Sequence, residues 1–170
     1  ISYFEHDIEF LLEALDSFPV PVIMLHGNHE SKDDVELICS YLKNITFAHK
    51  EIVAKNGFSF LCYGGDGFSS KDKAFEDWGN KIFKDLIPEK TVMLFHGPPY
   101  DTILDIPFEN HHSGNRSLKK FVDKIKPLLV MSGHIHECEG MNAWVKETFY
   151  INPGPFGVLI DLKDLEKQRK

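Results

Sequence analysis

Residues 20–30 read Val-Pro-Val-Ile-Met-Leu-His-Gly-Asn-His-Glu, an apolar run that stops at glycine and is followed by an amide, an imidazole and a carboxylate. A short, continuous apolar run is typical of a strand that is buried on both faces, as in a parallel sheet. In open α/β sheets, ligands bind beyond the carboxyl ends of such strands. The stretch therefore predicts a strand that carries Asn28 and His29 to a ligand-binding edge.

Two later stretches repeat this arrangement. Residues 91–95 form an apolar run that leads into His96, and residues 128–131 form another that is followed by His134 and His136. The carboxyl ends of parallel strands meet at one edge of a sheet, so the three strand ends are expected to converge.

The polar residues at these strand ends are of a kind that binds transition metals. Asn28 offers an amide oxygen, and His96, His134 and His136 offer imidazole nitrogens. Such a set suits Zn, Mn, Fe, Co or Ni better than Mg or Ca, whose ligands are mostly oxygen. For any one histidine taken alone, a hydrogen-bonded surface residue is the simpler interpretation, and the shared position at strand ends favours a metal site.

The composition predicts one globular domain and narrows the range of partners. The chain has 170 residues, of which 42% are hydrophobic and 14 are Phe, enough for one core. Nineteen basic and 26 acidic residues give a net charge of −7, which argues against a nucleic-acid surface or an anionic membrane as partner. An anionic substrate would therefore need a local positive centre such as a metal. The three cysteines lack paired spacing, which favours a reducing, cytoplasmic compartment.

Periodicity and turn residues predict strand pairs beside α/β units, and hence two packed sheets with helices outside. A hairpin turn is expected at Asn56-Gly57. The Gly-Gly-Asp-Gly loop at 64–67 is interpreted as a turn, with Asp66 as a candidate for lining a cleft. Helices are expected over residues 8–15 after an Asp7 cap, 32–42, 71–86 and 116–125. Strands are expected over residues 20–25, 45–54, 58–63, 91–95, 128–131, 141–145, 148–151 and 156–162, before a solvated tail at 163–170.

The motifs resemble those of a known family. Residues 27–30 (GNHE), 96–99 (HGPP) and 133–136 (GHIH) resemble, in order and spacing, the G-N-H-[DE], H-x-P-P and G-H-x-H motifs of the calcineurin-like metallophosphoesterases. Further residues resemble a branch of small predicted phosphohydrolases related to cyclic-AMP phosphodiesterase, namely Leu104-Asp105, His112-Ser113-Gly114, and residues 127–130 and 152–155. The resemblance implies a four-layer α/β/β/α fold, with two packed mixed sheets flanked by helices.

The resemblance also implies a mechanism and a set of site residues. The family hydrolyses phosphodiesters or phosphomonoesters with two divalent metal ions and a bridging hydroxide, so a small-molecule phosphoester is the expected substrate. By motif, Asn28, His96 and His134 would bind the second metal and His136 the first. His29 would act as general acid. The substrate phosphate would contact His112 and the start of the helix at Asn115, where the family usually has serine. The alternative for His112 is an ordinary loop histidine with no contact to substrate.

The chain departs from the family pattern at its start. The family's D-x-H motif and the bridging aspartate of its G-D motif have no counterpart ahead of residue 20, and residues 1–3 resemble the continuation of a G-D dipeptide. We therefore expect residues 1–170 to form one domain that lacks its first strand-helix-strand unit, with one metal site incomplete and little activity in isolation. Two alternatives are an inactive scaffold that binds proteins and a module that binds a single metal ion.

Overall fold

The computed structural model describes residues 5–65, 67, 69–109 and 111–169. The helices of this part of the chain are α1 (Glu5–Asp16), α2 (Lys32–Ser40), α3 (Lys73–Ile82), α4 (Arg116–Ile125) and α5 (Leu162–Gln168), with 3-10 turns η1 (Phe83–Asp85), η2 (Pro88–Lys90) and η3 (His136–Cys138). The strands are β1 (Val22–Met24), β2 (Ile45–Phe47), β3 (Glu51–Lys55), β4 (Phe58–Tyr63), β5 (Thr91–Phe95), β6 (Leu129–Ser132), β7 (Asn142–Val145) and β8 (Thr148–Ile151).

The larger sheet has the strand order β3-β4-β5-β6-β8-β7. Its four inner strands are parallel, and the two edge strands run antiparallel to their neighbours. One register row places Tyr63 beside Phe95, and Phe95 beside Ser132. The carboxyl ends of β4, β5 and β6 are thus level, and the loops that follow them leave the sheet at the same edge.

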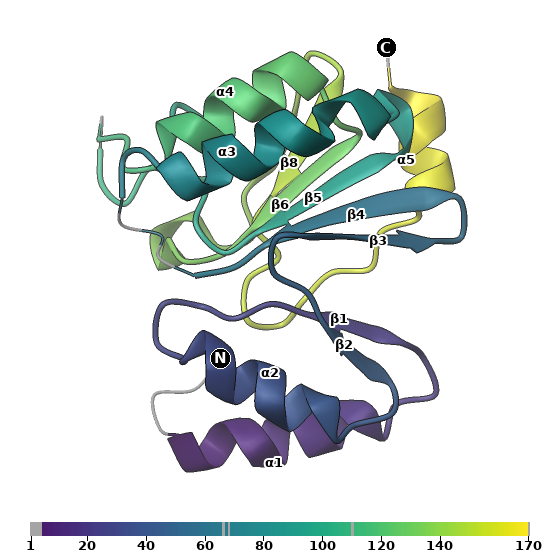
Figure 1. Ribbon diagram of the computed structural model, residues 1–170. Coiled ribbons are helices and arrows are strands. Elements are labelled where there is room, and N and C mark those ends of the chain that lie inside the picture. The colour runs from purple at the N-terminus through teal and green to yellow at the C-terminus, as the bar shows by residue number, and fades with distance from the viewer. Residues whose placement is uncertain (1–4, 66, 68, 110, 170) are drawn as a thin grey trace.

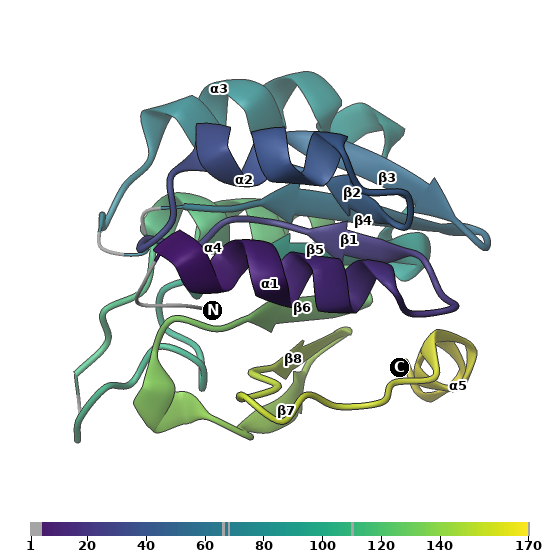
Figure 2. The same cartoon turned by 90° about the horizontal axis from the view of Figure 1, so that it is seen from below.

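The smaller sheet pairs β1 with β2 in parallel, with Val22 opposite Ile45. Helices α1 and α2 pack on it, and Leu12 and Val35 are fully buried in this contact. Figures 1 and 2 show α1 and α2 outside the smaller sheet, and α3 and α4 on the far face of the larger sheet. The layers therefore follow the order α/β/β/α, which confirms the predicted fold class.

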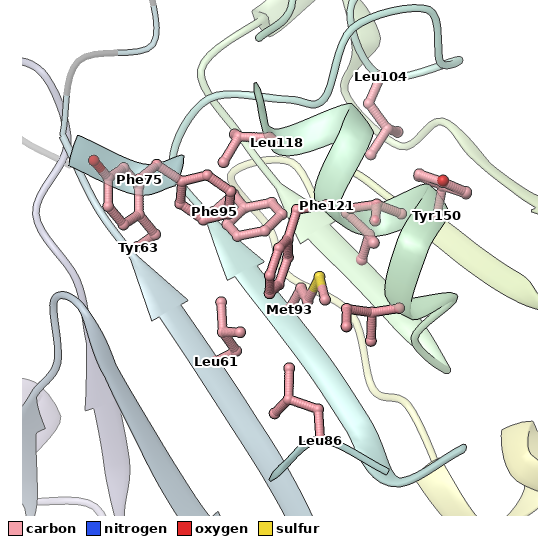
Figure 3. Packing of buried hydrophobic residues seen from close by; sticks show 13 residues of the cluster. Leu61, Tyr63, Phe75, Leu86, Met93, Phe95, Leu104, Leu118, Phe121 and Tyr150 are labelled. Carbon is pink, nitrogen blue, oxygen red and sulfur yellow. The ribbon is translucent and has the colours of Figure 1, made fainter. Parts of the chain in front are cut away.

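The main core lies between the larger sheet and helices α3 and α4 (Figure 3). Phe75 is at its centre, with its ring edge-on to those of Tyr63, Phe95 and Phe121 at centroid distances of 4.9, 5.8 and 5.3 Å. Each such aromatic pair contributes about 0.5–1.5 kcal/mol beyond burial of its area. This packing fixes the strand ends that carry the functional residues.

Local sequence signals explain several of the elements. Asn56 and Gly57 have φ values of 51° and 82°, and the hairpin of β3 and β4 turns on them as predicted. Ser31 and Asp72 cap α2 and α3 with side-chain oxygens. Helix α1, however, begins at Glu5, ahead of the predicted Asp7 cap, and α3 ends at Ile82 before a 3-10 turn rather than continuing to residue 86.

Residues 45–54 do not form the single strand that was expected. β2 ends at Phe47 and pairs with β1, whereas β3 starts at Glu51 and pairs with β4 in the other sheet. Lys50 has a left-handed φ of 56°, which is incompatible with an extended strand. The chain therefore crosses between the two sheets within this stretch.

The end of the chain also differs from expectation. Residues 156–162 form no strand, and Phe156 and Leu159 are 96% and 99% exposed. Residues 163–168, which were expected to belong to a solvated tail, are part of α5, which Asp161 caps through two backbone N–H groups and which buries Leu165. The two signals that sequence reasoning missed are this cap and the single buried leucine. No helix in the described part of the chain is long and apolar enough to cross a bilayer.

Candidate metal centre

Three polar atoms meet where β1, β5 and β6 end. His96 Nε2 lies 2.6 Å from Asn28 Oδ1 and 3.1 Å from His134 Nδ1, and His134 Nδ1 lies 3.1 Å from Asn28 Oδ1. These atoms belong to three different loops, each of which directly follows a strand. The structure therefore brings together three of the four residues that the sequence indicated as metal ligands. We call these three the donor triangle.

The donor triangle has the chemistry and the spacing of a metal site. Zinc-to-nitrogen and zinc-to-oxygen bonds of about 2.0–2.2 Å place neighbouring donors about 3 Å apart when they bind at right angles. The two separations of 3.1 Å that involve His134 Nδ1 fit this spacing, and the 2.6 Å between His96 Nε2 and Asn28 Oδ1 is shorter. A hydrogen atom on one ring nitrogen can satisfy only part of the triangle, whereas a cation accepts a lone pair from every member.

The protonation state of His96 also suits a ligand. Burial, followed by the neighbouring His134, lowers the pKa of His96 to about 4. The imidazole is therefore neutral at physiological pH, and a neutral ring is the form that binds a metal.

The His134 backbone is strained at this site. His134 has a φ of 63°, and a hydrogen bond of 2.7 Å from Ile135 N to Gly133 O closes a γ-turn around it. This form of γ-turn is rare, and left-handed backbone at a residue other than glycine costs about 1–3 kcal/mol. Gly133 N also donates to His96 O at 3.1 Å, which ties the two loops together. This turn places His134 Nδ1 3.1 Å from each of the other two donor atoms.

Gly67 makes the close packing around His134 possible. A Cβ atom at Gly67 would lie 2.8 Å from Cε1 and Nε2 of the His134 ring, and one at Gly97 would lie 2.7 Å from Gly67 Cα. Gly67 also has a φ of 84°. The glycine-rich loop interpreted from sequence as a turn thus forms part of the site wall, and its candidate Asp66 lies outside the described residues.

The remaining residues of the two histidine motifs lie next to the donor triangle. His29 directly follows Asn28 and is exposed, and Glu30 Oε2 accepts a hydrogen bond of 2.8 Å from Gly27 N, which closes this loop. His136 begins η3, two residues beyond His134, and its ring is not a member of the donor triangle.

Two further histidines join the sheets behind the site. The His26 ring is buried and lies 4.8 Å from that of His49, which in turn lies 4.9 Å from Tyr63. Gly64 N donates to His49 Nδ1 at 3.2 Å. Burial is the main cause that lowers the pKa of both histidines, to about 4 for His49. These contacts give His26 and His49 a place in the packing between the two sheets.

The candidate substrate residues lie on the loop between β5 and α4. His112 Nδ1 is 2.7 Å from Asp105 Oδ1. Asn115 caps α4, with its Oδ1 accepting from Ser117 N and Leu118 N, and its Nδ2 donates to Ser69 O at 2.8 Å. Both polar atoms of the Asn115 side chain therefore have hydrogen-bond partners within the protein, and a contact with substrate stays a prediction.

Comparisons with known proteins agree with the fold. One solved crystal structure is similar with a TM-score of 0.70 and 18% identity, over 89% of this chain and 64% of the other. A second, the crystal structure of TT1561 of Thermus thermophilus, has a TM-score of 0.72 and 13% identity, over 94% of this chain and 76% of the other. At these identities the likeness shows the fold alone, and the chain spans 64% of the length of the first structure.

No curated protein matches the sequence. The sequence model of the calcineurin-like phosphoesterases matches residues 3–138. The match includes the three strand ends that form the donor triangle, and it extends over most of the 170 residues. The chain therefore belongs to the calcineurin-like phosphoesterase family.

Proposed function

We propose that this protein hydrolyses a phosphodiester or phosphomonoester of a small molecule, with a divalent cation held by Asn28, His96 and His134. The observation that supports this most directly is the donor triangle, with separations of 2.6 to 3.1 Å. Family membership supports metal-dependent phosphoester hydrolysis in general. Mn, Fe, Zn, Co and Ni all suit an amide oxygen with two imidazoles.

The cation would compensate for the charge of the protein. With a net charge of −7, the surface repels an anionic phosphoester at long range. A divalent ion supplies Lewis acidity and offsets negative charge on the phosphoryl oxygens. Asn28, His96 and His134 contribute no formal negative charge as neutral ligands, so the full charge of the ion is available to the substrate.

We assign the remaining steps to histidines on the same loops. His29, exposed and adjacent to Asn28, would protonate the leaving oxygen as general acid. His112 would contact a non-bridging phosphate oxygen. The family resemblance adds a second ion with His136 as one ligand, which makes the proposed centre dinuclear.

A module that binds a single ion is the second candidate. The donor triangle accounts for one ion, and the described residues contain no group of three or more His, Cys, Asp or Glu that could hold another. Metal analysis separates the candidates: two ions per chain support the dinuclear hydrolase, whereas one ion without turnover supports the single-ion module.

The test is hydrolysis of bis-p-nitrophenyl phosphate by the intact protein with Mn, Zn, Co, Ni or Fe added singly. His96→Gln should lower metal affinity and kcat/KM by at least about 100-fold, since even residues outside the ligand set cost 10- to 100-fold. His29→Ala should lower kcat by about 100-fold or more with unchanged metal content. His111→Gln is the control, because His111 is exposed and stacks on Phe108 instead.

The proposal fails if the wild-type protein hydrolyses neither this diester nor p-nitrophenyl phosphate with any of the five metals. It also fails if His96→Gln retains full activity, because the donor triangle would then have no part in the reaction.

A further inference from the structure

Asp105 is a fully buried carboxylate on the loop between β5 and α4, and the hydrolysis proposed above gives it no role. Its exposed fraction is 0%. Oδ2 accepts hydrogen bonds of 3.0 Å from both Asp101 N and Gly114 N, and Oδ1 accepts one of 2.9 Å from Thr102 N. The fourth contact of the carboxylate is with the His112 ring, whose Nδ1 lies 2.7 Å from Oδ1.

These contacts determine which ring nitrogen of His112 carries hydrogen. A carboxylate has about four acceptor positions, and three backbone N–H groups occupy three of those on Asp105. Its remaining position therefore faces the His112 ring as an acceptor, which requires Nδ1 to be the donor. Nε2 is left to interact with something else. It lies 3.7 Å from Asp101 Oδ1, which is beyond hydrogen-bonding distance.

Backbone hydrogen bonds join the segment that carries His112 to the turn that follows His96. Asn115 N donates to Pro98 O at 2.9 Å, and Tyr100 N donates to Asn115 O at 3.0 Å. Pro98 is two residues beyond His96, a predicted metal ligand. The segment that carries His112 is therefore hydrogen-bonded to the turn that follows this ligand. The ring is 30% exposed and packs against Tyr100 at a centroid distance of 5.7 Å.

We propose that Asp105 is a positioning residue for His112: its carboxylate accepts a hydrogen bond from Nδ1 and favours the ring that carries hydrogen on both nitrogens, so that Nε2 can donate to an oxygen of the phosphoester substrate. The inference rests on the proposed hydrolase function for the identity of the ligand. Asp105 does not touch substrate. It fixes the tautomer and the orientation of the residue that does, as a second residue commonly does for a functional histidine.

A purely structural role for Asp105 makes a different prediction. The three backbone hydrogen bonds would shape the loop whatever the state of the His112 ring. The tautomer of His112 and the coupling between the two residues therefore distinguish the proposals, whereas a loss of stability does not.

The first test is the tautomer of His112, measured by nitrogen NMR of histidine-labelled, metal-free intact protein at a pH where imidazoles are neutral. The His112 signals are identified by their loss in His112→Gln. The wild-type ring should carry hydrogen on Nδ1. In Asp105→Asn the amide oxygen retains Asp101 N and Gly114 N, and its NH₂ group faces the ring, so hydrogen should move to Nε2.

Asp101→Asn is the matched control. It removes the other carboxylate near the ring, and asparagine tolerates the left-handed φ of 57° at this position. The tautomer should not change. Hydrogen on Nε2 in the wild-type protein would overturn the proposal without any variant, and so would an unchanged tautomer in a folded Asp105→Asn protein.

The second test is a double-mutant cycle on hydrolysis of bis-p-nitrophenyl phosphate with Mn. His112→Gln and Asp105→Asn should each raise KM about 10-fold with little change in kcat, because the first removes the charged donor to phosphate and the second removes the carboxylate that favours the charged ring. The double variant should be no worse than His112→Gln alone. An added loss from Asp105→Asn in that background would assign Asp105 to loop structure instead.

The two tests separate failure of this inference from failure of the hydrolase proposal. If no metal supports turnover in the wild-type protein, the hydrolase proposal falls. The tautomer measurement needs no activity, and its result still decides whether Asp105 positions His112.

Discussion

The His134 ring has no room to move toward Gly67. A Cβ atom on Gly67 would lie 2.8 Å from two ring atoms, closer than side-chain carbons approach one another in proteins. Since His134 Nδ1 is a member of the donor triangle, the missing side chain at Gly67 is a condition for the predicted metal site.

Gly67→Ala should therefore lower the affinity for Zn or Mn by about 10- to 100-fold, the range found for residues that orient metal ligands. Gly57→Ala is the matched control, because Gly57 has nearly the same φ, 82° against 84°, but no atom within 4 Å of the added methyl. Both variants should lose about 1–2 kcal/mol of stability from left-handed backbone. Calorimetric metal titration at a temperature where both are folded checks this, and equal metal affinities would refute the account.

The individual site residues differ in how far sequence could predict them. The convergence of Asn28, His96 and His134 was predictable because each lies just beyond an apolar strand within a family motif, and their role as metal ligands stays a prediction. The contributions of Gly67 and Asp105 were not, since each depends on contacts with residues distant in the chain. A glycine-rich turn and a loop aspartate have no spacing signal of their own.

Asn115, the N-cap of α4, connects the loop between β5 and α4 to the helix. Asn115 Oδ1 caps two N–H groups of the helix, and its Nδ2 holds the segment at Ser69. The buried face of the helix, which includes Phe121, packs in the main core against Phe75 of α3 (Figure 3). Loss of the cap therefore releases the loop that carries His112.

Asn115→Ala should lower the free energy of unfolding by about 1–2 kcal/mol, the usual cost of losing an N-cap. Asn115→Asp retains a carboxylate oxygen for the cap and should lose less than half as much. Urea denaturation of both variants measures the difference. If Asn115→Ala unfolds with the wild-type midpoint, the cap does not stabilise α4.

Elements with several agreeing local signals were predicted well. The hairpin at Asn56-Gly57 and the helix capped by Asn115 both formed as expected, because turn, cap and periodicity indicated the same structure. The prediction of a single strand over residues 45–54 was wrong, because β propensity does not reveal that the chain passes from one sheet to the other. Residues 156–162 are rich in β-forming residues too, but have no strand partner among the described residues.

The two sheets are joined near the metal centre by a row of rings rather than by a continuous apolar layer. His26 and Phe47 come from the smaller-sheet layer, and His49 carries the contact to Tyr63 on β4. Two of these rings are histidines. Assembly of the layers should therefore respond to pH in the range where buried histidines gain charge.

Stability should fall as pH decreases from about 6.5, the ordinary histidine pKa, toward 4. Burial lowers the pKa of His49 to about 4 in the folded protein. Between these values the unfolded chain binds a proton that the folded chain does not, so unfolding becomes more favourable. Above about 6.5 His49 is neutral in both states and has no effect. Partial solvent exposure limits the loss to about 1–2 kcal/mol.

Thermal melting between about pH 7.5 and 4.5 measures this dependence. His49→Gln should flatten the slope, because its amide can still accept from Gly64 N but does not titrate. Exposed His111→Gln should leave the slope as in the wild-type protein. Equal slopes in all three proteins would exclude His49 as the source.

The most direct test of the central claim is the position of a bound ion. Crystals of the intact protein with Zn or Mn should show an anomalous scattering peak about 2.0–2.2 Å from Asn28 Oδ1, His96 Nε2 and His134 Nδ1. That result would establish the donor triangle as a metal centre. An ion bound elsewhere with the triangle empty, or no ion at metal concentrations that support hydrolysis, would contradict the account.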